Sequence, residues 1–275
     1  MSSQQVIVIS NGMTSKGYWQ DFWRHREMLL FLAWRDILVR YKQTLVGASW
    51  VIIRPLLTML VFTLVFGRIA KLPSNDVPYP LLVFSGMLPW FFFSSALTEC
   101  SNSLVGNSNL LSKVYFPRLI VPTSTLLVCV VDYLISCVLL LAMLIWYEHW
   151  PDWRILLLPI FSLFAAIIAF GLGLWAAALN VRYRDFRHLI PFALQLGIYV
   201  SPVGYATTLI PEKWRFLYSL NPLVGVIDGF RWSLLGQESH IYWPSLLISV
   251  VGSVLVLVTG LRYFRKSEAG FADVI

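Results

Sequence analysis

Residues 119–147 read LIVPTSTLLVCVVDYLISCVLLLAMLIWY, and Asp132 is the one charged residue among them. A transmembrane helix needs about 20 consecutive, predominantly apolar residues, so this segment is long enough to cross a bilayer. Outward from it, similar apolar segments lie at about 45–66, 79–98, 155–180, 189–205 and 243–261. The sequence therefore predicts an all-α, polytopic membrane protein with six transmembrane helices, of which the fifth is short and ends at Ser201-Pro202.

The composition supports a membrane-embedded chain. Hydrophobic residues make up 58% of the 275 and charged residues 13%, against roughly 45–50% and about 25% in soluble domains. A water-soluble fold of this length could not hide that much apolar surface. Intrinsic disorder, disulfide scaffolds and free cytosolic enzymes are therefore excluded. The three cysteines Cys100, Cys129 and Cys137 lie in or beside apolar runs and give no disulfide framework.

The chain is expected to form one transmembrane domain over 19–275, after a polar tail at 1–18. Residues 19–43 predict an amphipathic interface helix, because Trp19, Trp23 and Trp34 fall on one apolar face. Such a helix could be a simple membrane anchor, or it could also present its polar face to a cytosolic partner. The outer insert at 206–240 is broken by prolines and predicts a re-entrant or interfacial helix pair that caps the outer mouth of a pathway.

The basic residues predict the orientation of the chain. With the N-terminus inside, fourteen Lys and Arg fall on the cytoplasmic side, six on the outer side, and Arg54 within the first span. This asymmetry predicts cytoplasmic N- and C-termini in the cytoplasmic (inner) membrane. The net charge of +7 is then mostly a consequence of topology, and nucleic acid is not an expected partner.

A series of short motifs follows along nearly the whole chain. They are Trp34–Thr44 followed by Gly47, Trp50 and Arg54-Pro55-Leu56; Phe84-Ser85-Gly86 before Pro89-Trp90; Phe116-Pro117-Arg118 with Pro122; Asn180–Asp185; Ser201-Pro202-Val203; Asn221-Pro222-Leu223 ahead of Arg231; and Phe271–Ile275. In this order the set resembles the membrane subunit of ABC-2 type polysaccharide exporters. The C-terminal motif is most similar to the O-antigen and teichoic-acid branches of that family.

The resemblance implies a channel-forming permease that exports a polyprenyl-pyrophosphate-linked polysaccharide, with lipopolysaccharide O-antigen as the first expectation. It also implies a homodimer in the lipid bilayer that works with two copies of an ABC ATPase subunit. Export of teichoic acid or capsular polysaccharide, or of a drug or lipid, remains an alternative. An integral membrane enzyme acting on polyprenyl-linked sugars is the alternative from another class.

The residues themselves give no sign of catalysis. The chain has no G-x-x-x-x-G-K-[ST] phosphate loop, so ATP and Mg are expected on the partner ATPase, and no cofactor on this chain. There is no D-x-D pair, no G-x-S-x-G elbow and no metal-ligand spacing among the four histidines. We therefore expect a transporter subunit with no catalytic residue and no metal site.

Two cytoplasmic regions are candidates for contact with the ATPase. The segment from Glu99 to Arg118 mixes polar and apolar residues and predicts a short coupling helix, and the interface helix ends nearby at Lys42. The expected contact residues are Asp36, Arg40, Lys42, Asn107, Leu110, Lys113 and Arg118. A second segment, 182–188, could also dock the ATPase, or its arginines could be ordinary positive-inside signals.

Arginines and aromatic residues are the candidates for the substrate pathway. Aromatic rings can stack on sugars as a chain slides past, although most such clusters belong to interfacial belts or packing. The expected pathway residues are Arg54, Trp90, Tyr199, Tyr205 and Arg231. We expect Arg231 near the outer interface, where it would meet a phosphate or a sugar hydroxyl, or simply snorkel.

Two further patterns leave alternatives open. Arg54 could pair with Asp132 inside the membrane, snorkel to lipid headgroups, or meet the substrate's pyrophosphate, because an unpaired charge at that depth is costly. Ala169, Gly173 and Ala177 form a small-residue stripe that permits close helix contact, either within one subunit or between two.

Overall fold

The computed structural model describes residues 15–42, 49–74, 77–183, 185–236, 241–268 and 270–271. The described residues are helical and contain no strand. The helices are α1 (Ser15–Arg24), α2 (Arg26–Lys42), α3 (Ser49–Phe62), η1 (Thr63–Ile69), α4 (Tyr79–Gly106), α5 (Ser108–Leu111), α6 (Ile120–Trp146), η2 (Trp153–Leu157), α7 (Leu158–Arg182), α8 (Phe186–Val200), η3 (Thr207–Leu209), α9 (Glu212–Ser219), α10 (Pro222–Leu235) and α11 (Trp243–Glu268). The all-α prediction is confirmed.

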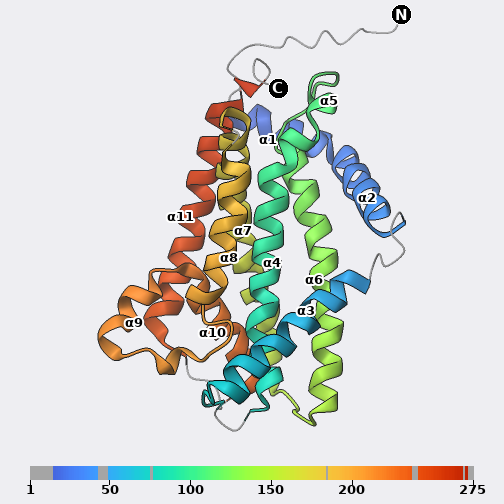
Figure 1. Ribbon diagram of the computed structural model, residues 1–275. Helices are drawn as coiled ribbons and strands as arrows, with labels where there is room; N and C mark the ends of the chain where they lie inside the picture. The colour runs from blue at the N-terminus through green and yellow to red at the C-terminus, as the bar shows by residue number, and fades with distance from the viewer. Residues whose placement is uncertain are drawn as a thin grey trace, which may run out of the picture.

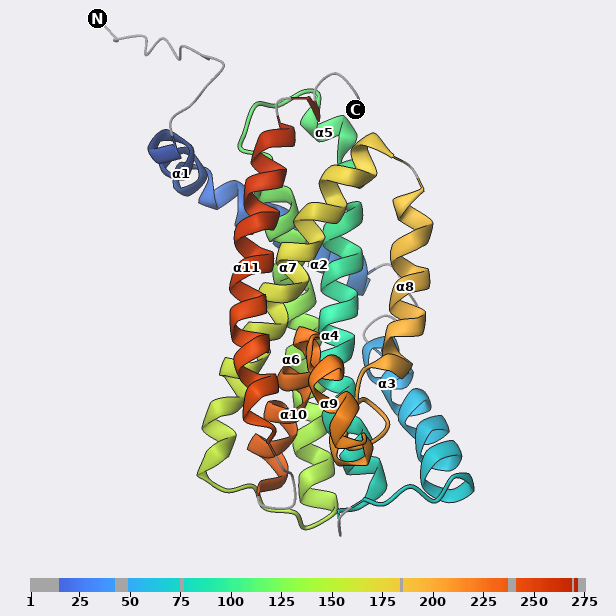
Figure 2. The ribbon, with the colours of Figure 1, turned by 90° about the vertical axis from the view of Figure 1, so that its left-hand side faces the viewer.

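The long helices α4, α6, α7 and α11 run side by side along the length of the molecule (Figures 1 and 2). The described N-terminal helix α1, the short α5 and the C-terminal end of α11 lie at one end of this bundle. The η3–α9–α10 insert lies toward the opposite end. The parts of the tail, the first span, the insert and the C-terminal motif that fall on 1–14, 43–48, 237–240 and 272–275 lie outside the described residues.

Among the residues that the structure describes, five helical segments are long and apolar enough to span a bilayer. They are Ser49–Ile69, α4, α6, Trp153–Arg182 and α11. The fifth predicted span, 189–205, corresponds to α8, which has 15 residues and so reaches only about 22 Å, against a hydrocarbon core of about 30 Å. The predicted interface helix is present as two helices, α1 and α2, that meet at His25.

The bundle is organised around α4. In the most apolar window of α4, 78% of the residues are buried inside the chain, against 11% for the first span and 22–33% for the others. Pro89 lies inside α4 and removes one backbone donor, a loss that neighbouring helices at membrane depth can accommodate. The first span is consequently the most peripheral of the five.

The small-residue stripe of α7 packs within the chain. Ala169 and Ala177 are fully buried, and a Cβ added to Gly173 would lie 2.6 Å from the Cβ of Cys100 on α4. Gly171 faces α11 in the same way, because an added Cβ there would lie 2.8 Å from the backbone of Val256. Of the two interpretations of this stripe, contact within one subunit is confirmed.

Gly260 on α11 tests this close helix contact. A Cβ at Gly260 would lie 3.0 Å from the carbonyl carbon of Gly171, and rigid backbone cannot move aside as a flexible side chain can. We expect Gly260→Ala to destabilise the bundle by about 1–3 kcal/mol, as overpacking does, and to lower the thermal unfolding midpoint in detergent. Gly106→Ala is the control, because nothing lies within 4 Å of its added Cβ. Equal midpoints for the two variants would contradict the close contact.

Candidate functional site

A cavity of about 820 Å³ lies beside α4, between α3, α6, α8 and the end of α2. We call it the α4 cavity. Its wall combines aromatic rings with hydroxyl side chains, among them Trp50, Trp90, Phe91, Phe92, Tyr133, Tyr199, Thr58, Ser94, Ser95, Thr98 and Ser136. Two arginines and two carboxylates, Arg40, Arg54, Glu99 and Asp132, complete the charged part of the wall. An aromatic and hydroxyl-rich wall can bind a ligand that has both apolar and hydroxylated faces.

The cavity brings together three of the predicted pathway residues. Arg54, from α3, places its guanidinium 5.6 Å from the ring centre of Phe91, within the range of a cation–π contact. Tyr199, from α8, is 59% exposed and stacks on Phe62 with 6.2 Å between ring centres. Trp90 is almost fully buried, and a Cβ added to Gly197 of α8 would lie 2.7 Å from its ring. Trp90 therefore holds α8 beside α4.

Tyr205 lies outside the wall of the α4 cavity. Its hydroxyl donates to the carbonyl of Tyr199 at 3.1 Å and lies 3.0 Å from the hydroxyl of Tyr218. These contacts connect the insert to the end of α8. The structure therefore places Tyr205 where it stabilises the turn after α8.

The structure corrects the prediction that Arg231 contacts a phosphate or a sugar hydroxyl. It is 3% exposed, and its guanidinium donates to the carbonyls of Leu82 at 3.2 Å, Val203 at 2.7 Å and Tyr205 at 2.7 Å. The chain leaves helical geometry between Ser201 and Tyr205, so carbonyls there need donors from elsewhere in the protein. Arg231 supplies them, and it is buried among backbone carbonyls instead of being free to contact a substrate.

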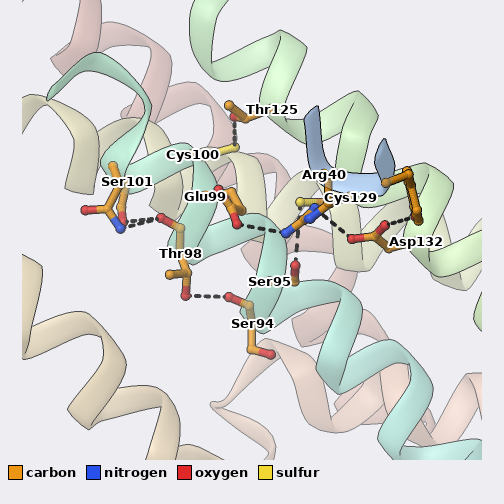
Figure 3. A network of polar contacts seen from close by, with 12 residues as sticks. Arg40, Ser94, Ser95, Thr98, Glu99, Cys100, Ser101, Thr125, Cys129 and Asp132 are labelled. Carbon is orange, nitrogen blue, oxygen red and sulfur yellow. Dashed lines mark hydrogen bonds and ion pairs between the residues drawn. The ribbon is translucent and has the colours of Figure 1, made fainter. Parts of the chain in front are cut away.

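Arg40, Glu99 and Asp132 form an ion-pair network at the wall of the α4 cavity (Figure 3). Arg40 on α2 lies 2.7 Å from Asp132 on α6 and 2.9 Å from Glu99 on α4. The hydroxyl of Tyr41 also donates to Asp132. Asp132 is therefore paired with Arg40, and the predicted Arg54–Asp132 pair is wrong.

The physical reason for this correction is that α2 packs along α6, so that the last turn of α2 lies beside Asp132. The sequence placed Arg40 on the cytoplasmic face as an ATPase contact, whereas the structure directs its guanidinium into the bundle. Burial alone would lower the pKa of Arg40, but the carboxylates of Asp132 and Glu99 raise it above its ordinary value. Burial, with the hydrogen bond to Asp132, raises the pKa of Tyr41. Both groups keep their protons at neutral pH.

The loop between α4 and α6 is shorter than predicted. Much of the 99–118 segment is the end of α4, and the predicted coupling helix is the four-residue α5. The side chain of Asn107 accepts a hydrogen bond from Arg35 of α2 at 3.0 Å, and Leu110 is half-buried. Lys113 is exposed just beyond α5.

The remaining predicted ATPase contacts differ in accessibility. Lys42 is exposed at the end of α2, and Asp36 pairs with its neighbour Arg35 at 2.7 Å. Arg118 turns inward, since its backbone N–H donates to Glu268 at 2.9 Å and its guanidinium lies 5.7 Å from the ring centre of Phe271. In the second candidate segment, Arg184 lies outside the described residues.

Residues 27–235 match the family model of the ABC-2 type transporter. The chain belongs to the ABC-2 type transporter family. An ABC-2 membrane subunit works with an ABC ATPase and spans the membrane several times, so this chain is a transporter subunit. The α4 cavity lies within the matched residues, as do α2, α3, α6 and α8.

Several named proteins are similar to this ABC-2 subunit over most of its length. The O-antigen export system permease protein RfbA of Myxococcus xanthus is 27% identical over 258 residues, covering 93% of this chain and 98% of that protein. A protein of the same name from Klebsiella pneumoniae is 28% identical over 253 residues, covering 90% and 95%. The polysialic acid transport protein KpsM of Escherichia coli is 24% identical over 245 residues, covering 87% and 92%.

The ion-pair network predicts an order of effects. The Asp132 side chain is 17% exposed and that of Glu99 is 45% exposed, so water compensates the loss of Glu99 better. We expect Asp132→Asn to destabilise the ABC-2 subunit by about 1–3 kcal/mol, because Arg40 loses its less solvated partner. Glu99→Gln should cost about 0–1 kcal/mol, as an exposed pair does. Thermal unfolding in detergent measures both, and the reverse order would contradict this assignment.

Proposed function

We propose that this chain is the channel-forming subunit that exports a lipid-linked polysaccharide, with O-antigen as the first candidate polymer. The observation that carries the proposal is the α4 cavity, whose wall combines aromatic rings with hydroxyls. Sugar rings offer apolar C–H faces and hydroxyl edges, and both find partners on such a wall. The names of the two RfbA relatives, which align over nearly their whole length, support the same substrate.

Arg54 is our candidate contact for the pyrophosphate of the lipid carrier. Arg40 is held by two carboxylates, whereas Arg54 has the ring of Phe91 beneath its guanidinium, which leaves its N–H donors available. An arginine can contact a phosphate with two parallel hydrogen bonds. Arg54 would hold the carrier headgroup while the sugar chain enters the cavity.

The transport machine that we propose contains two copies of this chain and two ATPase subunits, with both termini in the cytoplasm. The positive-inside asymmetry supports the orientation. The largely exposed first span and the open side of the α4 cavity support a second copy. ATP and Mg would be bound by the ATPase, and α5 with Lys113 would contact it.

Capsular polysaccharide export is the second candidate function, since the KpsM relative is named as a polysialic acid transport protein. Its identity and its coverage of this chain are lower than those of the two RfbA relatives described above. O-antigen therefore remains the first candidate.

Replacement of Arg54 tests the export function. We expect Arg54→Ala to lower surface polysaccharide at least tenfold, with lipid-linked polymer accumulating inside the cell, because the headgroup loses its cationic contact. Arg54→Lys should retain part of the export, since it keeps the charge but not the paired donors. Arg68→Ala is the matched control, because Arg68 is exposed at the end of the same span. Normal export by Arg54→Ala would remove the headgroup role.

Cross-linking tests the ATPase contact. In a background without Cys100, Cys129 and Cys137, we expect Lys113→Cys to form a disulfide with cysteines on the contact surface of the co-expressed ATPase. Ile69→Cys, at the far end of the first span and 78% exposed, should form none. A cross-link from Ile69→Cys, or none from Lys113→Cys with any of those ATPase positions, would contradict both the docking and the orientation.

A further inference from the structure

We propose that the α4 cavity selects an uncharged glycan, because four of its hydroxyl groups donate to their own helices and present acceptors to the cavity, and its charged residues balance in number. A polymer that carries a carboxylate on every repeat would be disfavoured. This inference rests on the proposed function and adds the class of polymer that the site accepts.

The first argument is the direction of the hydroxyl protons. Thr58 donates to the carbonyl of Arg54 at 2.9 Å, and Ser94 donates to Phe91 at 3.2 Å. Thr98 and Ser136 likewise donate to the carbonyls four residues earlier, at 2.8 and 3.0 Å. A hydroxyl has one proton and two lone pairs. In this arrangement each of these four side chains donates its proton to its own helix and offers its lone pairs to the cavity.

These acceptors come from three helices around one cavity. Thr58 lies on α3, Ser94 and Thr98 lie on α4, and Ser136 lies on α6, and all four line the wall. The hydroxyls of a sugar are donors that can rotate toward any nearby acceptor. A ring of acceptors therefore suits a polymer that is bound weakly and slides past without a fixed register.

A carboxylate, unlike a sugar hydroxyl, has no proton to donate to these acceptors. An ionised carboxylate is acceptor only, so it could bond these four hydroxyls only where they gave up their bonds to the helix. A buried acceptor without a donor keeps its full desolvation penalty. Arg40 is held by two carboxylates and Arg54 is assigned to the carrier diphosphate, so an acidic repeat would pay that penalty as it entered.

The second argument is the charge balance of the wall. Arg40 and Arg54 are matched by Glu99 and Asp132, so the charged residues lining the cavity sum to zero. Arg40 is bridged to both carboxylates, which leaves two carboxylates around one guanidinium at that end. A polyanion would meet net negative charge there, whereas a single diphosphate at the end of a neutral chain needs only Arg54.

The substrate test uses cells that express this chain with its own ATPase. They are supplied with one of two polyprenyl-diphosphate-linked polymers of equal length: a neutral hexose polymer, or one with a uronic acid in each repeat. We expect the surface fraction of the neutral polymer to exceed that of the acidic polymer at least tenfold. Equal export, or a preference for the acidic polymer, would overturn the inference and leave the proposed function standing. Export of neither polymer would overturn the proposed function itself.

Variants of this chain separate its selectivity from that of the ATPase. The triple variant Ser94→Ala, Thr98→Val, Ser136→Ala removes three acceptors and should lower neutral export at least tenfold. The matched control is Ser249→Ala, Ser253→Ala, Thr259→Val on α11, where the hydroxyls make the same helix-backbone bonds outside the cavity. The conservative set Ser94→Thr, Thr98→Ser, Ser136→Thr keeps the hydroxyls and should restore part of the export that the cavity triple loses. Export by the conservative set no higher than that of the cavity triple, or export by the cavity triple equal to the control, would overturn the acceptor argument.

The charge argument has its own readout. Glu99→Gln, chosen because Glu99 is the more exposed partner of Arg40, should raise the ratio of acidic to neutral polymer at the surface at least threefold. A ratio is used because it does not depend on how much of the variant reaches the membrane. An unchanged ratio would overturn the charge argument.

Discussion

The architecture around the α4 cavity depends on the hydrogen bonds that the buried guanidinium of Arg231 donates to backbone carbonyls of two other segments. Backbone carbonyls at membrane depth have no water to bond, so every irregular segment there needs donors from the protein. The chain leaves helical geometry after α8, and Arg231 donates to carbonyls in that turn and to Leu82 on α4. One buried cation thus joins the insert, the end of α8 and the central helix. These bonds hold the turn after α8 against α4, beside the α4 cavity.

The walls of the cavity differ in how firmly they are held. Gly171 and Gly173 let α7 approach α11 and α4 closely enough for backbone and side chain to touch, and dense packing of this kind resists deformation. The first span has only 11% of its apolar window buried, and α8 contacts α4 through Trp90 and Gly197. α4 is therefore the most closely packed wall of the cavity, whereas the first span, which includes α3, is the spanning segment least buried within this chain.

The sequence was sufficient for properties that depend on composition and local pattern. Long apolar runs predicted the spanning helices. Local pattern also accounts for the start of α10, where Pro222 is the first helical residue and the Asn221 side chain accepts from the N–H of Leu223 at 3.1 Å. The short α8 was also visible in the sequence, because Ser201-Pro202 interrupts it. Trp90, Arg54 and Tyr199 were predicted to share a pathway, and they line one cavity.

The sequence was insufficient wherever a side chain's partner lies on a distant helix. Depth estimates paired Asp132 with Arg54, because both lie in apolar segments at similar distances from the cytoplasmic side. They could not reveal that α2 packs along α6 and places Arg40, not Arg54, beside Asp132. For the same reason Arg231 and Arg118 were predicted to face outward, while the carbonyls and the carboxylate that hold them come from segments up to 150 residues away.

Two arginines of α2, Arg35 and Arg40, connect it both to the start of α5 and to the wall of the α4 cavity. Near its middle, Arg35 donates to Asn107 at the start of α5; at its end, Arg40 joins Glu99 and Asp132 in the cavity wall. The two arginines are five residues apart, about 7.5 Å along the axis. A shift of α5 that moved Asn107 would act on α2 through a direct hydrogen bond, and α2 is a rigid rod over that distance. The α5 end of the bundle and the cavity are thus connected by one helix, through the Arg35–Asn107 hydrogen bond and the two ion pairs of Arg40.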